Sequence, residues 1–172
     1  MITLLLSSKI LFAQTQSVNE YQIKAAYIFN FINFVTWPSD SFSKANSPFV
    51  IGILGDNPFD SSLKEIISEE FVNEHPIIIQ QYDNLEDIRT CHILFVNQTE
   101  TKKLKTADIT SLRKRSILTV SDAANFNLKG GIVKFFNKNN KIYLQINNEA
   151  AKAADLVISS KLLNLSEIFS QK

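Results

Sequence analysis

The sequence predicts an α/β domain with a three-layer, Rossmann-like sandwich, in which helices cover both faces of a mainly parallel sheet. Four short apolar runs predict strands that are buried on both faces, at residues 49–54, 76–80, 92–96 and 117–120. Segments with helical periodicity separate these runs, and this alternation is typical of a parallel sheet. Residues 132–136 and 141–146 flank a turn-like cluster and predict an antiparallel hairpin at one edge of the sheet.

The longest apolar segment, residues 21–38, predicts the helix around which the domain is built. Its apolar side chains surround the helix almost completely, which is typical of a buried helix. We expect this helix to run from Glu20 to Thr36, because Pro38 disfavours helical geometry at the residue before it. The segment is short and polar for a membrane span, since Asn30 and Asn33 interrupt it.

Three further helices are expected. The first follows Pro58, a residue suited to the first helical position, with Asp56 or Asn57 as the capping residue. The second is amphipathic and runs from Thr101 to Lys114, and the third closes the domain from Glu149 to about Leu165.

Length and composition indicate a single domain. The chain has 172 residues, enough to bury a proper core, and a net charge of +1, which gives no indication of a nucleic-acid partner. Residues 1–13 are apolar and end in Ala13, as a signal peptide does, although Lys9 interrupts them and a basic start is missing. A start codon assigned too late would explain both departures, and the alternative is an ordinary N-terminal strand or helix. We expect a signal peptide at residues 1–13, a short lead at residues 14–18, one domain at residues 19–172, and export to the periplasm.

No motif for catalysis, nucleotide binding or metal binding is recognisable. The sequence contains neither G-x-G-x-x-G nor G-x-x-x-x-G-K-[ST], so no nucleotide cofactor is indicated. Ser41–Lys44 matches S-x-x-K, but the companion motifs of the serine β-lactam enzymes are absent. Cys91 and His92 are adjacent and would point to opposite faces of a strand, which makes shared metal ligation awkward. We therefore expect no enzymatic activity, no cofactor and no metal.

The first candidate binding site is one edge of the first helix. Asn30, Asn33 and Trp37 follow each other at spacings of three and four, so they share this edge. Tryptophan is favoured at the centres of protein interfaces, and the edge could therefore bind a partner. The alternative is that the asparagines cap or bridge to a loop while Trp37 packs in the core.

The second candidate site lies at the carboxyl ends of two strands. Asp56 and Asn57 follow one strand, and Ser121 and Asp122 follow another. Ligands bind beyond the carboxyl ends of the strands in open α/β sheets, so these residues could hold a small ligand. Capping and turn formation explain the same residues adequately. In either case we expect both aspartates to lie in exposed turns.

Several motifs, taken in order, resemble the YfiR family. They are KAAYIFNFINFVTWP, FVIGILGDNPF, CHILFV, ILTVSD, GGIVKF and LQINNEAAKAADLVISSKLLNL, and the resemblance spans residues 21–165. It implies an exported bacterial protein with a Rossmann-like fold and no enzymatic activity. It further implies a homodimeric periplasmic regulator that binds and represses a membrane-bound sensor such as a diguanylate cyclase, and so modulates cyclic-di-GMP signalling and biofilm formation.

The sequence departs from the better-known members of the family in its cysteines. Those members carry paired cysteines, whereas Cys91 is the only cysteine here, so redox control through an internal disulfide is not carried over. No functional residue is transferred from the family. The alternative interpretation is a periplasmic small-ligand-binding module that uses the corner near Asp56 and Ser121.

Overall fold

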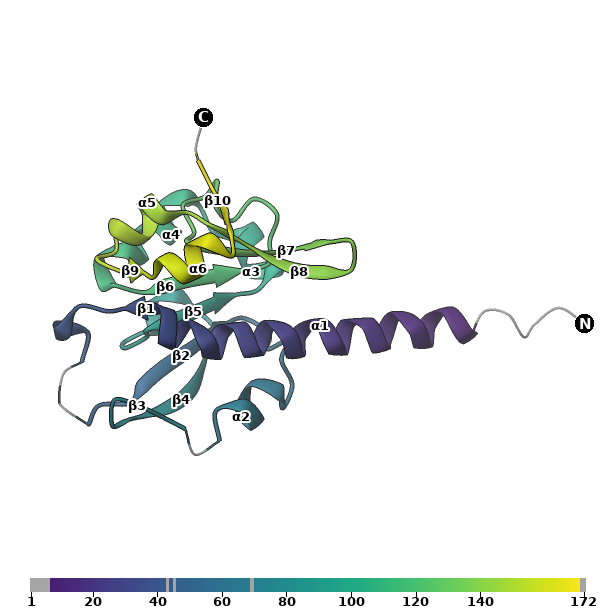
Figure 1. Ribbon diagram of the computed structural model, residues 1–172, viewed down its shortest axis with the longest axis horizontal. Coiled ribbons are helices and arrows are strands. Elements are labelled where there is room, and N and C mark those ends of the chain that lie inside the picture. The colour runs from purple at the N-terminus through teal and green to yellow at the C-terminus, as the bar shows by residue number, and fades with distance from the viewer. Residues whose placement is uncertain (1–6, 43, 45, 69, 171–172) are drawn as a thin grey trace, which may run out of the picture.

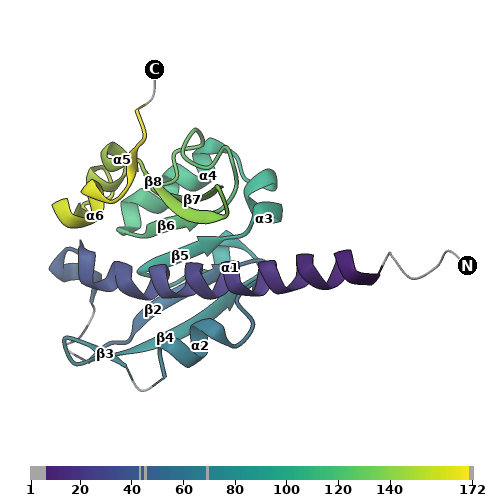
Figure 2. The same ribbon diagram turned by 45° about the vertical axis from the view of Figure 1, so that its right-hand side comes forward.

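An eight-stranded sheet forms the centre of the computed structural model, which describes residues 7–42, 44, 46–68 and 70–170, and only the backbone for residues 7–19. The strand order is β10-β8-β7-β6-β5-β2-β4-β3. Five neighbouring strands are parallel: β4 (His75–Tyr82), β2 (Phe49–Leu54), β5 (Ile93–Val96), β6 (Leu118–Ser121) and β7 (Val133–Lys138). They follow one another up the page in Figure 2. The expected mainly parallel sheet is confirmed.

Antiparallel strands extend the sheet at both edges. Strand β8 (Lys141–Ile146) pairs antiparallel with β7, and β10 (Glu167–Ile168) adds parallel to β8. Asn139 and Asn140 connect β7 to β8 with φ values of 53° and 58°, the left-handed conformation that a two-residue hairpin turn requires. The expected hairpin is therefore confirmed. At the opposite edge, the short strand β3 (Phe71–Val72) forms a second hairpin with β4, which the sequence did not predict.

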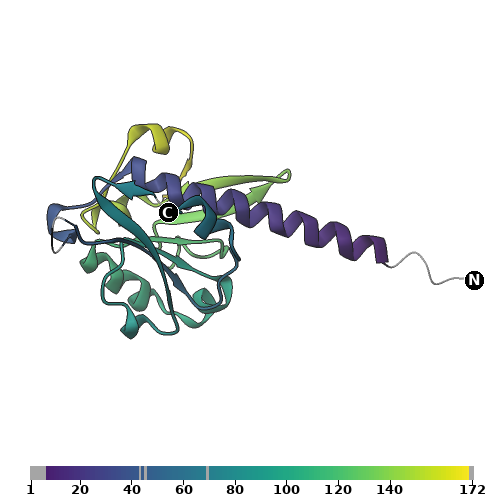
Figure 3. The same ribbon diagram turned by 90° about the horizontal axis from the view of Figure 1, so that it is seen from below.

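Helices cover both faces of the sheet, as Figure 3 shows from below. One face carries α1 (Ser7–Phe34), α2 (Ser62–Ile66), α5 (Asn148–Lys152) and α6 (Ser160–Asn164). The other face carries α3 (Gln98–Lys103), α4 (Thr106–Ser111) and the 3-10 helix η3 (Leu112–Arg115). A separate hydrophobic cluster fills each interface, one around Phe31 and Phe95 and the other around Leu94 and Phe126. This is the expected three-layer sandwich.

Helix α1 crosses the sheet, and its N-terminal part extends beyond it (Figure 1). The helix starts earlier than expected and ends at Phe34, two residues before the expected end. The next two residues form β1 (Val35–Thr36), which pairs antiparallel with β9 (Val157–Ile158). The backbone N–H of Ser159 donates to the carbonyl of Phe34 over 2.8 Å and so satisfies one of the open carbonyls at the helix end.

The expected signal peptide lies largely outside the described part of the chain. Residues 1–6 are not described, and residues 7–13 belong to the first turns of α1, of which only the backbone is described. Within the described residues, no helix combines the length and the apolar character needed to cross a membrane.

The helix expected from Thr101 to Lys114 is divided into α3, α4 and η3. Leu104 is extended, with ψ of 139°, and the carboxylate of Asp108 accepts a hydrogen bond of 2.7 Å from the N–H of Lys105. This bond starts a new helix at Thr106. The ammonium group of Lys129 donates to the carbonyls of Thr101 and Leu104, at 2.6 Å and 2.7 Å, and so stabilises the break.

The closing helix expected from Glu149 to Leu165 is also wrong. Helix α5 ends at Lys152, and Asp155 has a left-handed φ of 56° that the helix cannot continue. The chain then enters β9, and α6 begins after Ser159, whose hydroxyl oxygen accepts from the N–H of Leu162. Pairing between β9 and β1, which are far apart in the sequence, therefore overrides the local helical preference of this segment.

Candidate partner-binding site

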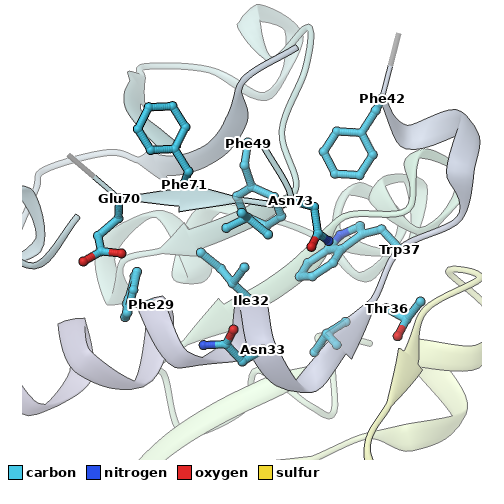
Figure 4. Close-up of a pocket in the computed structure, with 12 residues that line it drawn as sticks. Phe29, Ile32, Asn33, Thr36, Trp37, Phe42, Phe49, Glu70, Phe71 and Asn73 are labelled. Atoms are coloured by element: carbon cyan, nitrogen blue, oxygen red, sulfur yellow. The ribbon is translucent and has the colours of Figure 1, made fainter. Parts of the chain in front are cut away.

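A groove of about 560 Å³ opens beside the C-terminal end of α1 (Figure 4). One wall comes from the end of α1 and from Trp37, and the opposite wall comes from the β3–β4 hairpin. Aromatic side chains line much of it, and polar groups of Asn33, Glu70 and Asn73 lie among them. We call this cavity the Trp37 groove.

Trp37 is firmly anchored in its wall of the groove. Its indole N–H donates to the carbonyl of His92 over 3.2 Å. Its ring meets the ring of Phe49 edge-on, with 5.0 Å between centroids and an angle of 88° between planes. The side chain is half-buried, so Trp37 packs against the core and also lines the groove. The packing that the alternative interpretation expected of Trp37 is therefore present, and partner binding by this residue stays a prediction.

Phe71 is the exposed aromatic residue of the opposite wall, and the sequence analysis missed it. The side chain comes from β3 and is 64% exposed. Exposed large apolar side chains beside a cavity are typical of interaction surfaces. The signal in the sequence is an aromatic residue within the otherwise polar stretch SEEFVNEH, but it becomes informative only when the β3–β4 hairpin is known.

A buried histidine supports the floor of the groove. His92 is 2% exposed, and its ring packs against the rings of Phe42 and Phe49, with 4.6 Å between centroids in each pair. Its Nδ1 accepts from the N–H of Val50 over 3.0 Å, and Nε2 lies 3.2 Å from the carbonyl of Ser41. This pattern requires a neutral imidazole with the proton on Nε2, because Nδ1 must be an acceptor and a carbonyl cannot donate.

The environment of His92 favours its neutral form. Burial lowers the pKa of His92 below its usual 6.5, and the nearby His75 lowers this pKa further, while the hydrogen bond to the carbonyl of Ser41 partly opposes both effects. Protonation at Nδ1 would also remove the acceptor for the N–H of Val50.

We expect the stability of the domain to fall on mild acidification because of His92. Below pH 6.5 the unfolded chain takes up a proton at this residue that the folded chain does not. The contribution of neutral His92 to the free energy of unfolding is therefore fully present above pH 6.5. This contribution is lost as the pH falls from 6.5 to the lowered pKa of His92 in the folded state. Urea unfolding at a series of pH values between about 5 and 8 measures this. His92→Phe keeps an aromatic ring but cannot titrate, so its stability should depend less on pH; equal slopes for both proteins would contradict the prediction.

The structure separates the three residues expected on the partner-binding edge. Asn33 and Trp37 both line the Trp37 groove. Asn30 is exposed, and its side-chain amide donates to the carbonyl of Ala26 one turn earlier, over 2.7 Å. Asn30 lines a different groove, between α1 and β8, together with Tyr143. Of the expected edge, only the part formed by Asn33 and Trp37 belongs to this site.

The second candidate site, at the strand ends, is closed by α1. Lys24 is 2% exposed, and its ammonium group lies 2.6 Å from the carboxylate of Asp122 and 2.6 Å from that of Glu20. The hydroxyl of Tyr21 also donates to Asp122, over 2.9 Å. The side chain of Asp122 is only 6% exposed, so the expectation of an exposed turn is wrong at this residue. Burial and the Asp122 carboxylate raise the pKa of Tyr21 well above its usual range.

Ser121 and Asn57, two further residues of the strand-end corner, form local hydrogen bonds. Ser121 is fully buried, and its hydroxyl accepts from the N–H of Ala123 over 3.1 Å. Asp56 and Asn57 are exposed, as expected for Asp56, and the side-chain oxygen of Asn57 accepts from the N–H of Phe59. Neither Asp56 nor Asn57 caps α2, which begins four residues later than Pro58.

No metal-binding cluster is visible in the described part of the chain, and its one cysteine there is not activated. Among residues 20–42, 44, 46–68 and 70–170, whose side chains are described, no group of three His, Cys, Asp or Glu side chains could hold a metal ion. Cys91 is buried, and its thiol donates to the carbonyl of Ile93 over 3.0 Å. Burial raises the pKa of this thiol to about 12, so it is not a reactive thiolate.

Comparison with known families assigns the fold to a regulatory family. A family model described as YfiR/HmsC-like matches residues 21–167. The chain belongs to the YfiR/HmsC-like family. No curated protein matches the sequence. At the level of the family, YfiR/HmsC-like proteins are non-catalytic periplasmic regulators of diguanylate cyclase signalling. The matched segment includes both walls of the Trp37 groove.

Proposed function

We propose that this YfiR/HmsC-like protein is a non-enzymatic periplasmic regulator that binds the periplasmic domain of a membrane-bound diguanylate cyclase and represses it. Repression would lower cyclic-di-GMP and reduce biofilm formation. Family membership supports the class of function. The single observation that supports a protein partner is the exposed Phe71 ring, opposite the anchored Trp37 across one groove (Figure 4).

The composition of the Trp37 groove suits a protein partner. Interfaces combine an apolar centre, rich in aromatic residues, with a polar rim. Here Trp37, Phe49 and Phe71 supply the centre, while Asn33 and Glu70 supply polar groups. Because Trp37 is held by Phe49 and His92, its ring is ordered before a partner binds, which reduces the entropic cost of association.

The strand-end corner is a weaker candidate. Lys24 and Tyr21 both contact Oδ2 of Asp122, and Oδ1 is buried, so a ligand could reach this carboxylate only by displacing the side chains of α1 that cover it. We therefore prefer the partner-binding function over the small-ligand alternative.

We expect Phe71→Ala to abolish regulation without unfolding the protein. An interface residue of this type contributes about 2 kcal/mol or more to association, whereas a side chain that is 64% exposed contributes little to folding. In the native host, deletion of the gene should raise cyclic-di-GMP, and the wild-type gene should restore the lower level. Phe71→Ala should fail to restore it while the purified variant melts at nearly the wild-type temperature.

Leu128→Ala is the matched control for this experiment. Leu128 is 61% exposed and lies outside the Trp37 groove, so its variant should restore the low level of cyclic-di-GMP. A deletion that leaves cyclic-di-GMP unchanged would contradict the regulatory function. Full restoration by Phe71→Ala would contradict the assignment of the groove.

A further inference from the structure

A second cavity, of about 430 Å³, lies at the amino ends of β2 and β5, and we call it the arginine pocket. Val50 of β2 and Ile78 of β4 are register partners and form its apolar wall. Val50 lies four residues before Leu54, so both side chains point to the face of the sheet that carries α3 and α4. No residue of α3 or α4 lines the pocket, and Ile78 is 40% exposed. This end of the sheet face is therefore open to solvent.

The topology brings two arginines to this pocket. Arg89 precedes β5 and Arg115 precedes β6, and neighbouring parallel strands begin at the same edge of a sheet. Nη2 of Arg115 donates to the carbonyls of Ile88 and Arg89, over 2.6 Å and 2.9 Å, so this guanidinium group is held in place beside the backbone of Arg89. The side chain of Arg89 forms no hydrogen bond or ion pair with the described residues. One arginine is therefore fixed, and the other is free to close on a ligand.

The positive charge of the arginine pocket is not neutralised. Asp40 is the only acidic residue in its lining; it is exposed and forms no ion pair with Arg89 or Arg115. Among the described residues, every ion pair is formed by a lysine. His92 also lines the pocket, and its hydrogen bonds require the neutral form. Two positive charges therefore stand against one negative charge, which favours an anionic ligand.

Ser41 supplies an independent sign of a missing ligand. It lines the arginine pocket, and its hydroxyl is buried without a hydrogen-bond partner among the described residues. The backbone around it is fixed, because the N–H of Ser41 donates to the carbonyl of Pro38 and the carbonyl of Ser41 accepts from His92. An unpaired buried hydroxyl costs free energy, and a hydroxyl hydrogen can rotate towards an acceptor. An acceptor oxygen in the pocket would satisfy it.

We infer that the arginine pocket binds a phosphate monoester, with the phosphoryl group between Arg89 and Arg115 and the organic part on Ile78 and Val50. Guanidinium groups match phosphate oxygens in pairs, and a phosphoryl group offers three acceptor oxygens where a carboxylate offers two. The volume lies within the range of about 300–1,000 Å³ that is typical of small-molecule sites, so the pocket holds more than an inorganic ion. This inference does not rest on the proposed regulation of a cyclase, because the arginine pocket shares no lining residue with the Trp37 groove.

Isothermal titration calorimetry of the full chain tests the site, with phenyl phosphate as the probe in a phosphate-free buffer at about pH 7.5, where the monoester carries close to two charges. We expect a dissociation constant below about 1 mM, and weaker binding of both inorganic phosphate and benzoate. Absence of binding at about 10 mM phenyl phosphate overturns the inference. Equal affinity for inorganic phosphate overturns the role of the organic part, and equal affinity for benzoate overturns the preference for a phosphoryl group.

Arg89→Gln should raise the dissociation constant of phenyl phosphate about tenfold or more, because it removes a charged donor. The fold should not change, since the side chain of Arg89 has no partner among the described residues, and circular dichroism checks this. Lys114→Gln is the matched control: Lys114 is exposed, lies next to Arg115 and does not line the arginine pocket. If both variants weakened binding equally, only the overall charge would matter, and the site would be wrong.

Two further variants test the remaining contacts. Ser41→Ala should weaken the binding of phenyl phosphate about threefold or more without lowering the melting temperature, because the hydroxyl has no partner in the free protein. A purely structural serine would show the opposite, a lower melting temperature and unchanged binding. Ile78→Thr should weaken the binding of phenyl phosphate more than that of inorganic phosphate, because only the ester has an apolar part. Equal effects on both probes would contradict the placement of the organic part.

Discussion

Phe31→Ala is expected to lower the free energy of unfolding by about 3–5 kcal/mol, because it removes a fully buried ring from the centre of the α1 interface. The ring of Phe31 is 0% exposed and stacks on Phe135 of β7, with 6.2 Å between centroids and an angle of 20° between planes. Tyr27, one turn earlier in α1, contacts both rings. Three aromatic side chains therefore join the helix to the sheet at this point. If the ring of Phe31 is removed, the two remaining rings cannot fill the space it leaves by small shifts.

Urea unfolding of the wild-type protein and the variant measures this loss. A typical domain has a stability of about 5–15 kcal/mol, so Phe31→Ala should leave a protein that is only marginally folded. Phe71→Ala is a suitable control, since it removes the same side chain from a position that is 64% exposed. If the two variants unfolded at similar urea concentrations, Phe31 would not be the anchor of α1 in the core.

Strands β2, β4, β5, β6, β7 and β8 were predictable because each carries its own signal, whereas the two-residue strands β1, β3, β9 and β10 were not. The expectation that β4 is buried on both faces is wrong, because β4 lies near the edge of the sheet and only Ile77 and Tyr82 are buried in it. The run FVIGIL at residues 49–54 is apolar throughout, and all six residues are buried in β2, which is covered on both faces. The alternation of apolar and polar residues at 141–146 likewise matches β8, where Leu144 and Ile146 are buried and Tyr143 is exposed. For such segments the local pattern reflects the environment in the fold directly.

The helix boundaries were not predictable because distant partners decide them. Residues 149–165 have a helical composition, yet the pairing of Val157–Ile158 with β1 breaks the helix. Val35, the pairing partner of Ile158, lies 123 residues earlier in the chain, and no local pattern indicates it. The same holds for the Trp37 groove, because Phe71 becomes a wall of the groove only through the β3–β4 hairpin.

Asp122 shows the same limit at the level of a single side chain. A Ser-Asp pair after an apolar run predicts an exposed turn, and only the structure places Lys24 of α1 at this carboxylate, 98 residues away in the chain. The local pattern therefore correctly placed Asp122 at the carboxyl end of a strand, but it did not predict that its carboxylate is buried.

Lys24→Met is expected to lower the free energy of unfolding by about 3–5 kcal/mol, since it leaves the buried Asp122 carboxylate without its cation. The hydroxyl of Tyr21 remains as a donor to Oδ2 of Asp122, while Oδ1 is buried and has no hydrogen-bond partner among the described residues. Lys152→Met is the matched control, because Lys152 forms an ion pair with Glu149 on the surface, where both side chains are more than half exposed. An exposed pair of this kind contributes about 0–1 kcal/mol, so the control should unfold almost as the wild-type protein does.

The double variant Lys24→Met, Asp122→Leu separates the ion pair from the packing around it. Removing both charges leaves no isolated ion in the interface, so the double variant should be more stable than Lys24→Met alone, although it has lost one more native side chain. The interaction free energy from the double-mutant cycle then measures the coupling of Lys24 to Asp122 directly. Two results would show that the ion pair does not hold α1 against the end of β6. One is that Lys24→Met is no more destabilising than Lys152→Met. The other is that the effects of Lys24→Met and Asp122→Leu on the free energy of unfolding are additive. The strand-end corner would then be open to a ligand, because the side chain that fills it could leave at little cost in stability.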